Sequence, residues 1–137
     1  MEVLVQTYIV AGVVIKRDGK YLLVQENAPG EKIHGLWNFP AGRVAQGDSI
    51  ERTAIKEAQE ESGYEVELIR KLGIWQDNTE TPPKHAFEAR IISGELKWPE
   101  DEILQAKWFT LSEIEAMKDI LRSEWIMGAI NLLENNE

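Results

Sequence analysis

The chain contains no cysteine among its 137 residues, so disulfide bonds and thiolate metal sites are excluded. The two histidines, His34 and His85, are isolated and form no metal-binding pattern. No apolar run approaches the roughly 18 residues of a membrane-spanning helix, and the first residues lack the basic region and cleavage site of a signal peptide. We therefore expect no membrane segment, and a reducing cytoplasm is the default location.

An excess of positive charge is also lacking. The chain carries 24 acidic against 15 basic residues, a formal net charge of −9. Because an acidic surface repels a phosphate backbone, a nucleic-acid polymer is a disfavoured partner. Hydrophobic residues make up 43% and charged residues 28%, which is typical of a soluble globular protein, and the length suits a single domain over residues 1–137.

Apolar and β-branched runs predict the strands. A run over residues 7–15 predicts a buried strand, the Arg17-Asp18-Gly19-Lys20 segment a turn, and residues 21–24 the returning strand of a hairpin. Further strands are predicted at 36–39, within 64–75, at 86–92 before a Ser93-Gly94 turn, and at 106–109. The intervening loops are predicted at 41–47, 77–84 and 98–102.

Helical periodicity and capping patterns predict three helices. The first spans about Ser49–Ser62, with Asp48 as its predicted N-cap and Gly63 as its C-cap. A Ser112–Glu115 capping box predicts a helix to about Leu121, and Ser123 is predicted to cap a last helix that ends near Leu133. The order of elements indicates an α/β fold, a mixed β-sheet between helices in an α/β/α sandwich.

Three glutamates, Glu57, Glu60 and Glu61, stand at positions i, i+3 and i+4 of the first predicted helix. Like charges at this spacing destabilise a helix by about 0.2–0.5 kcal/mol per pair. They also precede Gly63 at the negative end of the helix macrodipole, which opposes each acid by about 0.3–1 kcal/mol. A solvated face with a Lys56–Glu60 pair is one interpretation; a bound cation that compensates the acids is the other.

The segment before this helix favours the bound cation. Gly42 to Gly47 is a glycine-bearing loop beside a helix N-terminus, where backbone groups can face an anionic ligand. Carboxylate oxygens suit Mg²⁺ or Mn²⁺, and such a cation would neutralise the glutamates and bridge phosphate oxygens. The pattern therefore indicates hydrolysis of a phosphoanhydride bond.

Residues 42–64 resemble the Nudix box of the Nudix (MutT-like) hydrolases. The pattern opens with a glycine, here Gly42, followed by an acid, here Asp48. It continues with a basic residue and a glutamate (Lys56-Glu57), a pair of glutamates (Glu60-Glu61) and a last glycine (Gly63). The segment 36–41 and the late Glu102 with Trp108-Phe109 also look like parts of the family. The resemblance implies a Nudix fold and a Mg²⁺-dependent pyrophosphohydrolase. Its substrate would be a nucleoside di- or triphosphate or another X-linked diphosphate, a small molecule.

By this resemblance Glu57, Glu60 and Glu61 would bind Mg²⁺ or Mn²⁺, with the Ala41 carbonyl as a further ligand. Glu57, Glu61 or Glu102 would act as the general base. For Glu102, a solvated loop acid is the alternative.

Three positions depart from the pattern, and the first is Ala41, which stands where a second glycine is usual but keeps the backbone carbonyl. Asp48 replaces a glutamate and is interpreted as a helix cap or as a group behind the metal ligands. Lys56 replaces an arginine and so lacks the planar bidentate fork that would orient neighbouring acids.

A diphosphate substrate also needs basic side chains. Arg43 is the first candidate because it follows Gly42 directly, and a tryptophan such as Trp37 could stack on a base. The remaining candidates are Arg52, Lys84, His85 and Arg90. For all five, Arg43 included, a surface charge is the alternative interpretation, and for the tryptophans it is packing in the core or at its rim.

Leu36 to Gly42 looks more like the branch of the family that acts on nucleoside triphosphates and thiamine-related pyrophosphates. Two other classes of function stay open. One is a Nudix-like module that binds a nucleotide without turning it over; the other is an acidic interaction domain without a ligand. Family members are often dimers, so a homodimer is an alternative to a monomer, although no residue pattern marks an interface.

Overall fold

A mixed sheet of seven strands organises the computed structural model, which describes residues 8–135. Its main path runs β3-β2-β1-β6-β5, while β4 pairs with β1 and β7 pairs with β2. The elements in chain order are β1 (Val10–Arg17), β2 (Lys20–Glu26), β3 (Trp37–Asn38), β4 (Ala41–Arg43), α1 (Ile50–Ser62), β5 (Tyr64–Trp75), β6 (Lys84–Gly94), β7 (Ile103–Phe109), α2 (Leu111–Glu115), the 3-10 turn η1 (Lys118–Ile120) and α3 (Trp125–Asn135).

The hairpin of β1 and β2 follows the sequence prediction. Asp18 and Gly19 both have positive φ, 53° and 77°, which matches the twist of a two-residue hairpin turn. The first strand lies two to three residues later than the predicted 7–15: it begins at Val10 and continues to Arg17. Residue 7 of the predicted strand lies outside the described residues.

Strands β1 and β2 separate beyond their hairpin. The two strands pair at Lys16 and Arg17, whereas the first residues of β1 pair with β4 on one side and with β6 on the other. Val10 therefore lies between Arg43 and Lys84 in one row of the sheet. This divergence leaves room between β1 with β4 and β2 with β3, which is where the cleft described below opens.

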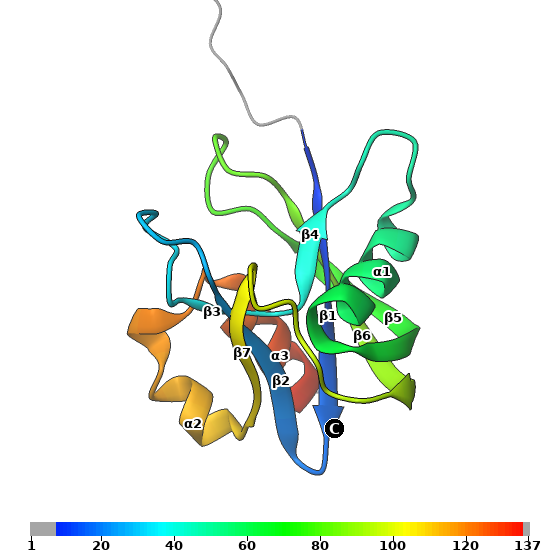
Figure 1. Ribbon diagram of the computed structural model, residues 1–137, viewed down its shortest axis with the longest axis vertical. Helices are drawn as coiled ribbons and strands as arrows, with labels where there is room; N and C mark the ends of the chain where they lie inside the picture. Colours follow the sequence, from blue (N-terminus) through cyan, green and yellow to red (C-terminus); the bar gives the residue numbers. More distant parts are fainter. Residues whose placement is uncertain (1–7, 136–137) are drawn as a thin grey trace, which may run out of the picture.

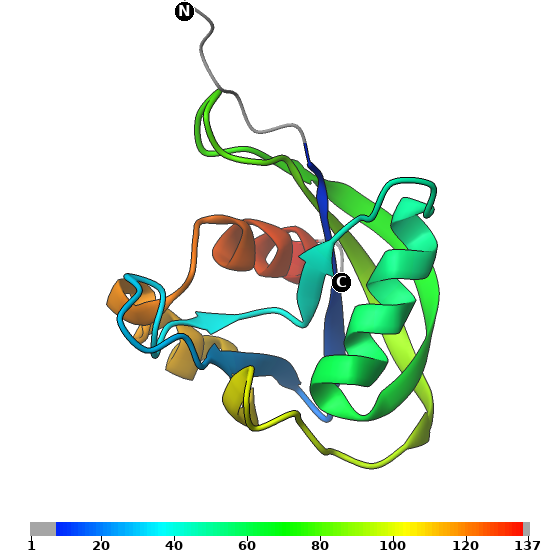
Figure 2. The same ribbon diagram turned by 45° about the horizontal axis from the view of Figure 1, so that its top comes forward.

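Helices cover both faces of the sheet, so the predicted α/β/α sandwich is confirmed (Figures 1 and 2). Helix α1 packs against β1 and β5, and its Ala54 and Ala58 join a core with Val13 and Phe87. Helix α3 and α2 enclose the second core on the opposite face. Within residues 8–135, no helix has the length and apolar character that a bilayer-spanning segment requires.

Several predicted strand boundaries are wrong because pairing, rather than local pattern, determines them. Ala41–Arg43, predicted as loop, forms β4 by pairing with β1. Ser93 and Gly94, predicted as a turn, end β6 opposite the start of β5. Strands β6 and β7 also begin earlier than predicted, at Lys84 and Ile103.

The N-cap of α1 is Ser49, so the prediction of Asp48 as the cap is wrong. Ser49 has an extended backbone, and its hydroxyl accepts a hydrogen bond from the Arg52 backbone N–H at 3.0 Å. Asp48 stands one residue too early to satisfy a free N–H of the first turn. The predicted Gly63 C-cap is confirmed, with a left-handed φ of 80°.

Helix α2 is shorter than predicted and starts earlier. Its capping box joins Thr110 and Glu113 rather than Ser112 and Glu115. The helix ends at Glu115, and only a 3-10 turn follows in the segment predicted as helical to Leu121.

Helix α3 starts at Trp125, and Ser123 does not cap it, because the Ser123 hydroxyl is buried with no hydrogen-bond partner among the described residues. Trp125 instead fixes this end of the helix. Its indole N–H donates to Asn38 Oδ1 at 2.9 Å, and its ring meets Phe39 edge-on at 5.2 Å. A Cβ at Gly12 would lie 2.7 Å from the Trp125 ring, so this close approach requires glycine.

The Gly63→Ala substitution should lower the free energy of unfolding by about 1–3 kcal/mol, measured by urea denaturation. The alanine would be held at positive φ, and its Cβ would collide with the Glu95 carbonyl. Gly30→Ala is the matched control, because Gly30 has a similar φ of 85° but open space around its Cβ position. Equal losses in both variants would contradict a steric contribution at Gly63.

Candidate active site

The apolar stripe of α1 ends in a carboxylate. Ala54 and Ala58 are fully buried, and Glu61 follows Ala58 by three residues on the same helical face. Glu61 is only 9% exposed. Helical spacing alone thus carries this acid into the margin of the core.

A backbone hydrogen bond holds Glu61 in place. The Ala41 N–H of β4 donates to Glu61 Oε1 at 2.8 Å. Burial raises the pKa of Glu61 well above its ordinary value, the Ala41 hydrogen bond opposes this rise, and the neighbouring Glu57 and Glu26 add to it. Glu61 therefore joins the end of α1 to β4 while lying among like charges.

Glu57 lies one helical turn before Glu61, against β4. A Cβ at Gly42 would overlap the Glu57 carboxyl group, so glycine is required for the strand to come this close. Burial and, to a smaller extent, the neighbouring Glu60 raise the pKa of Glu57 to about 7, while Lys56 opposes the rise. A nearby cation would offset the cost of charging this half-buried carboxyl group.

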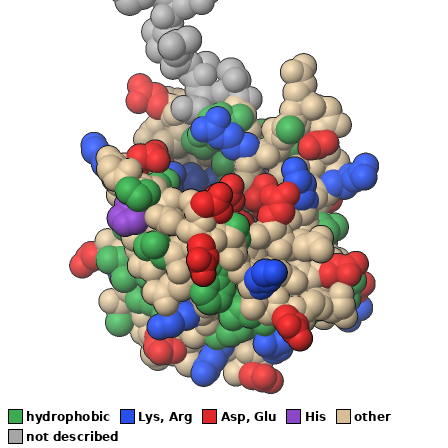
Figure 3. Space-filling view, viewed as in Figure 1, with side chains coloured by type: hydrophobic (Ala, Val, Ile, Leu, Met, Phe, Trp, Pro, Cys, Tyr) green, Lys and Arg blue, Asp and Glu red, His purple; other side chains and the backbone are tan. Residues whose placement is uncertain are grey.

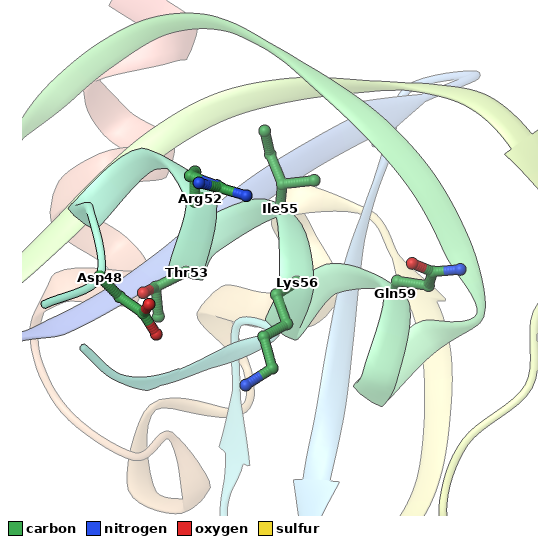
Figure 4. A pocket seen from close by; sticks show the side chains of 6 residues that line it. All are labelled: Asp48, Arg52, Thr53, Ile55, Lys56 and Gln59. Carbon is green, nitrogen blue, oxygen red and sulfur yellow. The ribbon is translucent and has the colours of Figure 1, made fainter. Parts of the chain in front are cut away.

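Glu60 and Lys56 lie on the solvent side of α1. Lys56 Nζ is 3.8 Å from Glu60 Oε1, and their side chains are 62% and 49% exposed, so the pair adds little stability. Lys56 also lines an open hollow of about 460 Å³ with Asp48, Arg52, Thr53, Ile55 and Gln59 (Figure 4). The three glutamates are not among the residues that line this hollow, so we do not regard it as the active site.

Glu102 reaches the same region from the loop between β6 and β7. Its backbone is fixed, because the Asn27 N–H donates to the Glu102 carbonyl at 2.9 Å. Its exposed carboxylate raises the pKa of both Glu57 and Glu61, which places its charge near theirs. The fold thus brings the four predicted acids into one neighbourhood.

A fifth acid, Glu26, was not predicted. It ends β2 and is half-buried, and burial raises its pKa; the hydrogen bond from Asn38 (Nδ2 to Oε1, 3.4 Å) and the charge of Arg122 oppose the rise. Glu102 raises its pKa as well. Its place two residues beyond the apolar run 21–24 does not by itself indicate a site, because its neighbours come from other parts of the chain.

These five glutamates, Glu26, Glu57, Glu60, Glu61 and Glu102, are called the acidic cluster below. Figure 3 shows acidic side chains gathered near the middle of this face, with basic side chains beside them. Within residues 8–135, however, no three His, Cys, Asp or Glu side chains stand at the mutual spacing of metal ligands. Glu61 is bound to the Ala41 backbone and Glu60 turns to Lys56, so the predicted ligands share a region without surrounding one point.

A cleft of about 260 Å³ opens beside the acidic cluster, between the diverging strands. Two predicted substrate ligands line it. Arg43 lies over the Tyr8 ring, 3.9 Å from its centroid, and Lys84 Nζ is 3.8 Å from Asp77 Oδ2. The lining residues of this cleft are Tyr8, Val10, Glu26, Ile33, Asn38, Ala41, Gly42, Arg43, Pro82, Lys84, Arg122 and Trp125.

Trp37 and Arg90, predicted to bind substrate, do not line the cleft. Trp37 is 5% exposed and packs edge-on against Phe109 at 4.9 Å, so its ring has no free face for a base. Arg90 forms an ion pair with Glu67 on β5. Arg43 lines the cleft because it lies on β4, whereas Trp37 and Arg90 lie on other strands. The sequence did not reveal this order of strands.

Two further basic candidates lie elsewhere. Arg52 lines the hollow on the outer side of α1. His85 is 7% exposed within β6, and its Nδ1 has no hydrogen-bond partner among the described residues.

Comparisons with known proteins match the domain to one family. The family model described as "NUDIX domain" matches residues 6–127. A solved NUDIX hydrolase from Nitrosomonas europaea is 28% identical, with a TM-score of 0.84 over 96% of this chain and 90% of that one. Nudix hydrolase 5 of Arabidopsis thaliana is 31% identical over 73% of this chain and 35% of its own length.

The NAD-capped RNA hydrolase NudC of Mannheimia succiniciproducens is 35% identical over 74% of this chain. The chain spans 35% and 39% of the lengths of these two curated relatives.

In the metal-free protein, stability should fall as the pH rises from about 4.5 to above 7. The folded protein holds a proton on Glu57 up to about pH 7, whereas the unfolded chain releases it near 4.5, so protonation favours the folded state and this contribution is lost as the pH passes the folded pKa. Urea unfolding with EDTA at several pH values measures the slope. Glu57→Gln should flatten it and Glu51→Gln should not; an unchanged slope in Glu57→Gln would contradict the raised pKa.

Proposed function

This chain belongs to the NUDIX family, and on that premise we propose that it is a Mg²⁺- or Mn²⁺-dependent pyrophosphohydrolase that cleaves a phosphoanhydride bond. The observation that carries the proposal is the crowding of Glu57, Glu60 and Glu61 at the negative end of α1 beside a cleft with basic side chains. The crowded acids at this end of the helix lower the stability of the fold, and a bound divalent cation would offset their repulsion.

The oxygen donors of the site fit such a cation by type. Glu57 and Glu60 would hold it together with the Ala41 carbonyl, and the free carboxylate oxygen of Glu61 would complete the set. When bound, the cation would neutralise the acids and stabilise negative charge on the phosphate groups. A cation would favour the ionised forms of Glu57 and Glu61, against the burial and like charges that raise their pKa values.

Glu102 is our choice for the general base. Cation binding would lower the pKa of Glu57 and Glu61 and make them weak bases, whereas the exposed Glu102 lies outside the proposed ligand set. Its fixed backbone and exposed side chain allow it to take a proton from an attacking water and pass it to solvent.

The cleft supports a diphosphate-linked small molecule as the substrate. Arg43 and Lys84 supply positive charge at its wall, next to the backbone of Ala41 and Gly42. Nucleoside di- and triphosphates and thiamine-related pyrophosphates are the candidates that follow from the sequence. We place the activity in the cytoplasm, in line with the absence of cysteine, and leave a homodimer as the alternative to a monomer.

A second candidate function is nucleotide binding without turnover. It is favoured by the Lys56–Glu60 pair, which engages one proposed ligand, and by the absence of a ready ligand cage within the described residues. Release of phosphate or pyrophosphate from a panel of diphosphate substrates with Mg²⁺ and Mn²⁺ distinguishes the two functions.

Glu60→Gln should reduce kcat at least about 10²-fold, because it removes a charged ligand while keeping the shape of the side chain. Its melting temperature should stay near or above that of the wild type, since the substitution relieves repulsion with Glu57. Glu51→Gln is the matched control, an exposed acid in the first turn of the same helix, and should retain activity. Normal turnover by Glu60→Gln would refute the ligand assignment.

Mg²⁺ should raise the melting temperature, and the added stability should grow with the logarithm of its concentration relative to Kd. Saturation at 100 times the Kd corresponds to about 2.7 kcal/mol of added stability. The shift should shrink in Glu57→Gln and persist in Glu51→Gln, as measured by differential scanning fluorimetry after EDTA treatment and dialysis. A shift of equal size in both variants would place the cation outside the acidic cluster.

A further inference from the structure

Lys84 is a buried cation with a weak partner. It is 7% exposed, and its only ion pair within residues 8–135 is the 3.8 Å contact with Asp77. That distance is longer than the roughly 2.7–2.9 Å of a charge-assisted hydrogen bond. A buried ammonium group held so loosely has capacity for a second, closer anion.

Arg122 adds a second positive charge at the same place. The parallel bridge between Trp37 and Leu121, and the hydrogen bond from the Arg122 N–H to the Trp37 carbonyl at 2.7 Å, carry its side chain into the cleft. No ion pair or side-chain hydrogen bond joins its guanidinium to another described residue. Arg122 also disfavours the charge of Lys84, so the two cations repel each other.

The charges of the cleft are ordered from one end to the other. Burial lowers the pKa of Lys84, Asp77 opposes this, and Arg122 adds to it. Arg122 in turn influences Glu26, which responds to Glu102. The acidic cluster therefore borders the cleft at Glu26, Ala41 and Gly42. Lys84 and Arg122 form the basic end of the cleft.

The sheet separates these two ends. The row that holds Lys84 lies two residues along β1 from the row of Ala41 and Gly12, about 7 Å, and β6 lies two strands from β4, about 10 Å. The Lys84 backbone is thus about 12 Å from that of Ala41. A ligand that contacts both ends therefore extends along the cleft from β4 to β6.

We propose that Lys84 and Arg122 form a second anion-binding subsite, which takes a phosphate or carboxylate carried by the part of the substrate remote from the scissile anhydride. The planar guanidinium can bind such a group with two parallel hydrogen bonds, and Lys84 contributes a point charge from the other side. The role in substrate choice rests on the proposed hydrolase function; the anion binding itself does not.

Anion binding is tested first in the absence of metal. Calorimetric titration of the EDTA-treated protein with inorganic phosphate, and separately with acetate, should show weaker binding to Arg122→Gln by about tenfold or more. Comparison of the two anions shows whether the subsite prefers a phosphate or a carboxylate. Arg122→Lys should restore part of the affinity, because it keeps the charge and loses the fork.

Lys118→Gln is the matched control, since Lys118 is an exposed cation four residues before Arg122 and outside the cleft. It should bind both anions as the wild type does. Lys84→Gln should weaken binding as Arg122→Gln does; because Lys84 is buried, the partly exposed Arg122 is the decisive position if this variant does not fold. Wild-type affinity for both anions in Arg122→Gln would overturn the subsite.

Substrate choice is tested with two dinucleotide diphosphates that differ only in a ribose 2′-phosphate, NADH and NADPH. The wild type should favour the phosphorylated substrate in kcat/KM, and Arg122→Gln should reduce that ratio by about 10-fold to 100-fold. An equal loss on both substrates would mean that Arg122 grips the scissile diphosphate, which overturns the proposal. Absence of hydrolysis on the whole substrate panel, with phosphate binding intact, would refute the hydrolase function and leave the anion site standing.

Discussion

The hydrogen bond from the Ala41 N–H to the Glu61 carboxylate is the contact on which the site depends. Strand β4 has only three residues, and it pairs with the first part of β1. Glu61 gives this short strand a second attachment, to the end of α1. The same bond fixes the backbone of Ala41 and Gly42 against the helix, so the proposed metal ligands and one wall of the cleft are positioned together.

That attachment has an electrostatic consequence. It holds a carboxylate at 9% exposure next to Glu57, whose own carboxyl group lies where a side chain at Gly42 would be. Both groups have raised pKa values because burial and like charges disfavour ionisation. Packing of Ala54 and Ala58 keeps the acids there, so the helix sustains a repulsion that an isolated helix would relieve by fraying.

Local pattern predicted those parts of the fold that local pattern controls. The hairpin turn, the span of α1, Gly63 and the grouping of Glu57, Glu60 and Glu61 all follow from spacing within a few residues. The same reasoning failed at Asp48, where Ser49 one position later has the better cap geometry, and at β4, which exists only because β1 pairs with it. Glu26 and Arg122 could not be found from the sequence, because their roles depend on which strands and loops meet at the cleft.

The divergence of β1 from β2 explains why acids and bases meet there. Near the hairpin the two strands pair with each other; toward the start of β1, β4 and β6 take up its edges, while β2 turns to β3 and β7. The acids of α1 then lie beside the opening, against β4, on one face of the sheet. Arg122 enters from the segment that leads into α3 on the other face. A ligand that spans the opening would contact both layers of the sandwich. Its charges would therefore have to complement the acids on one side and Arg122 on the other.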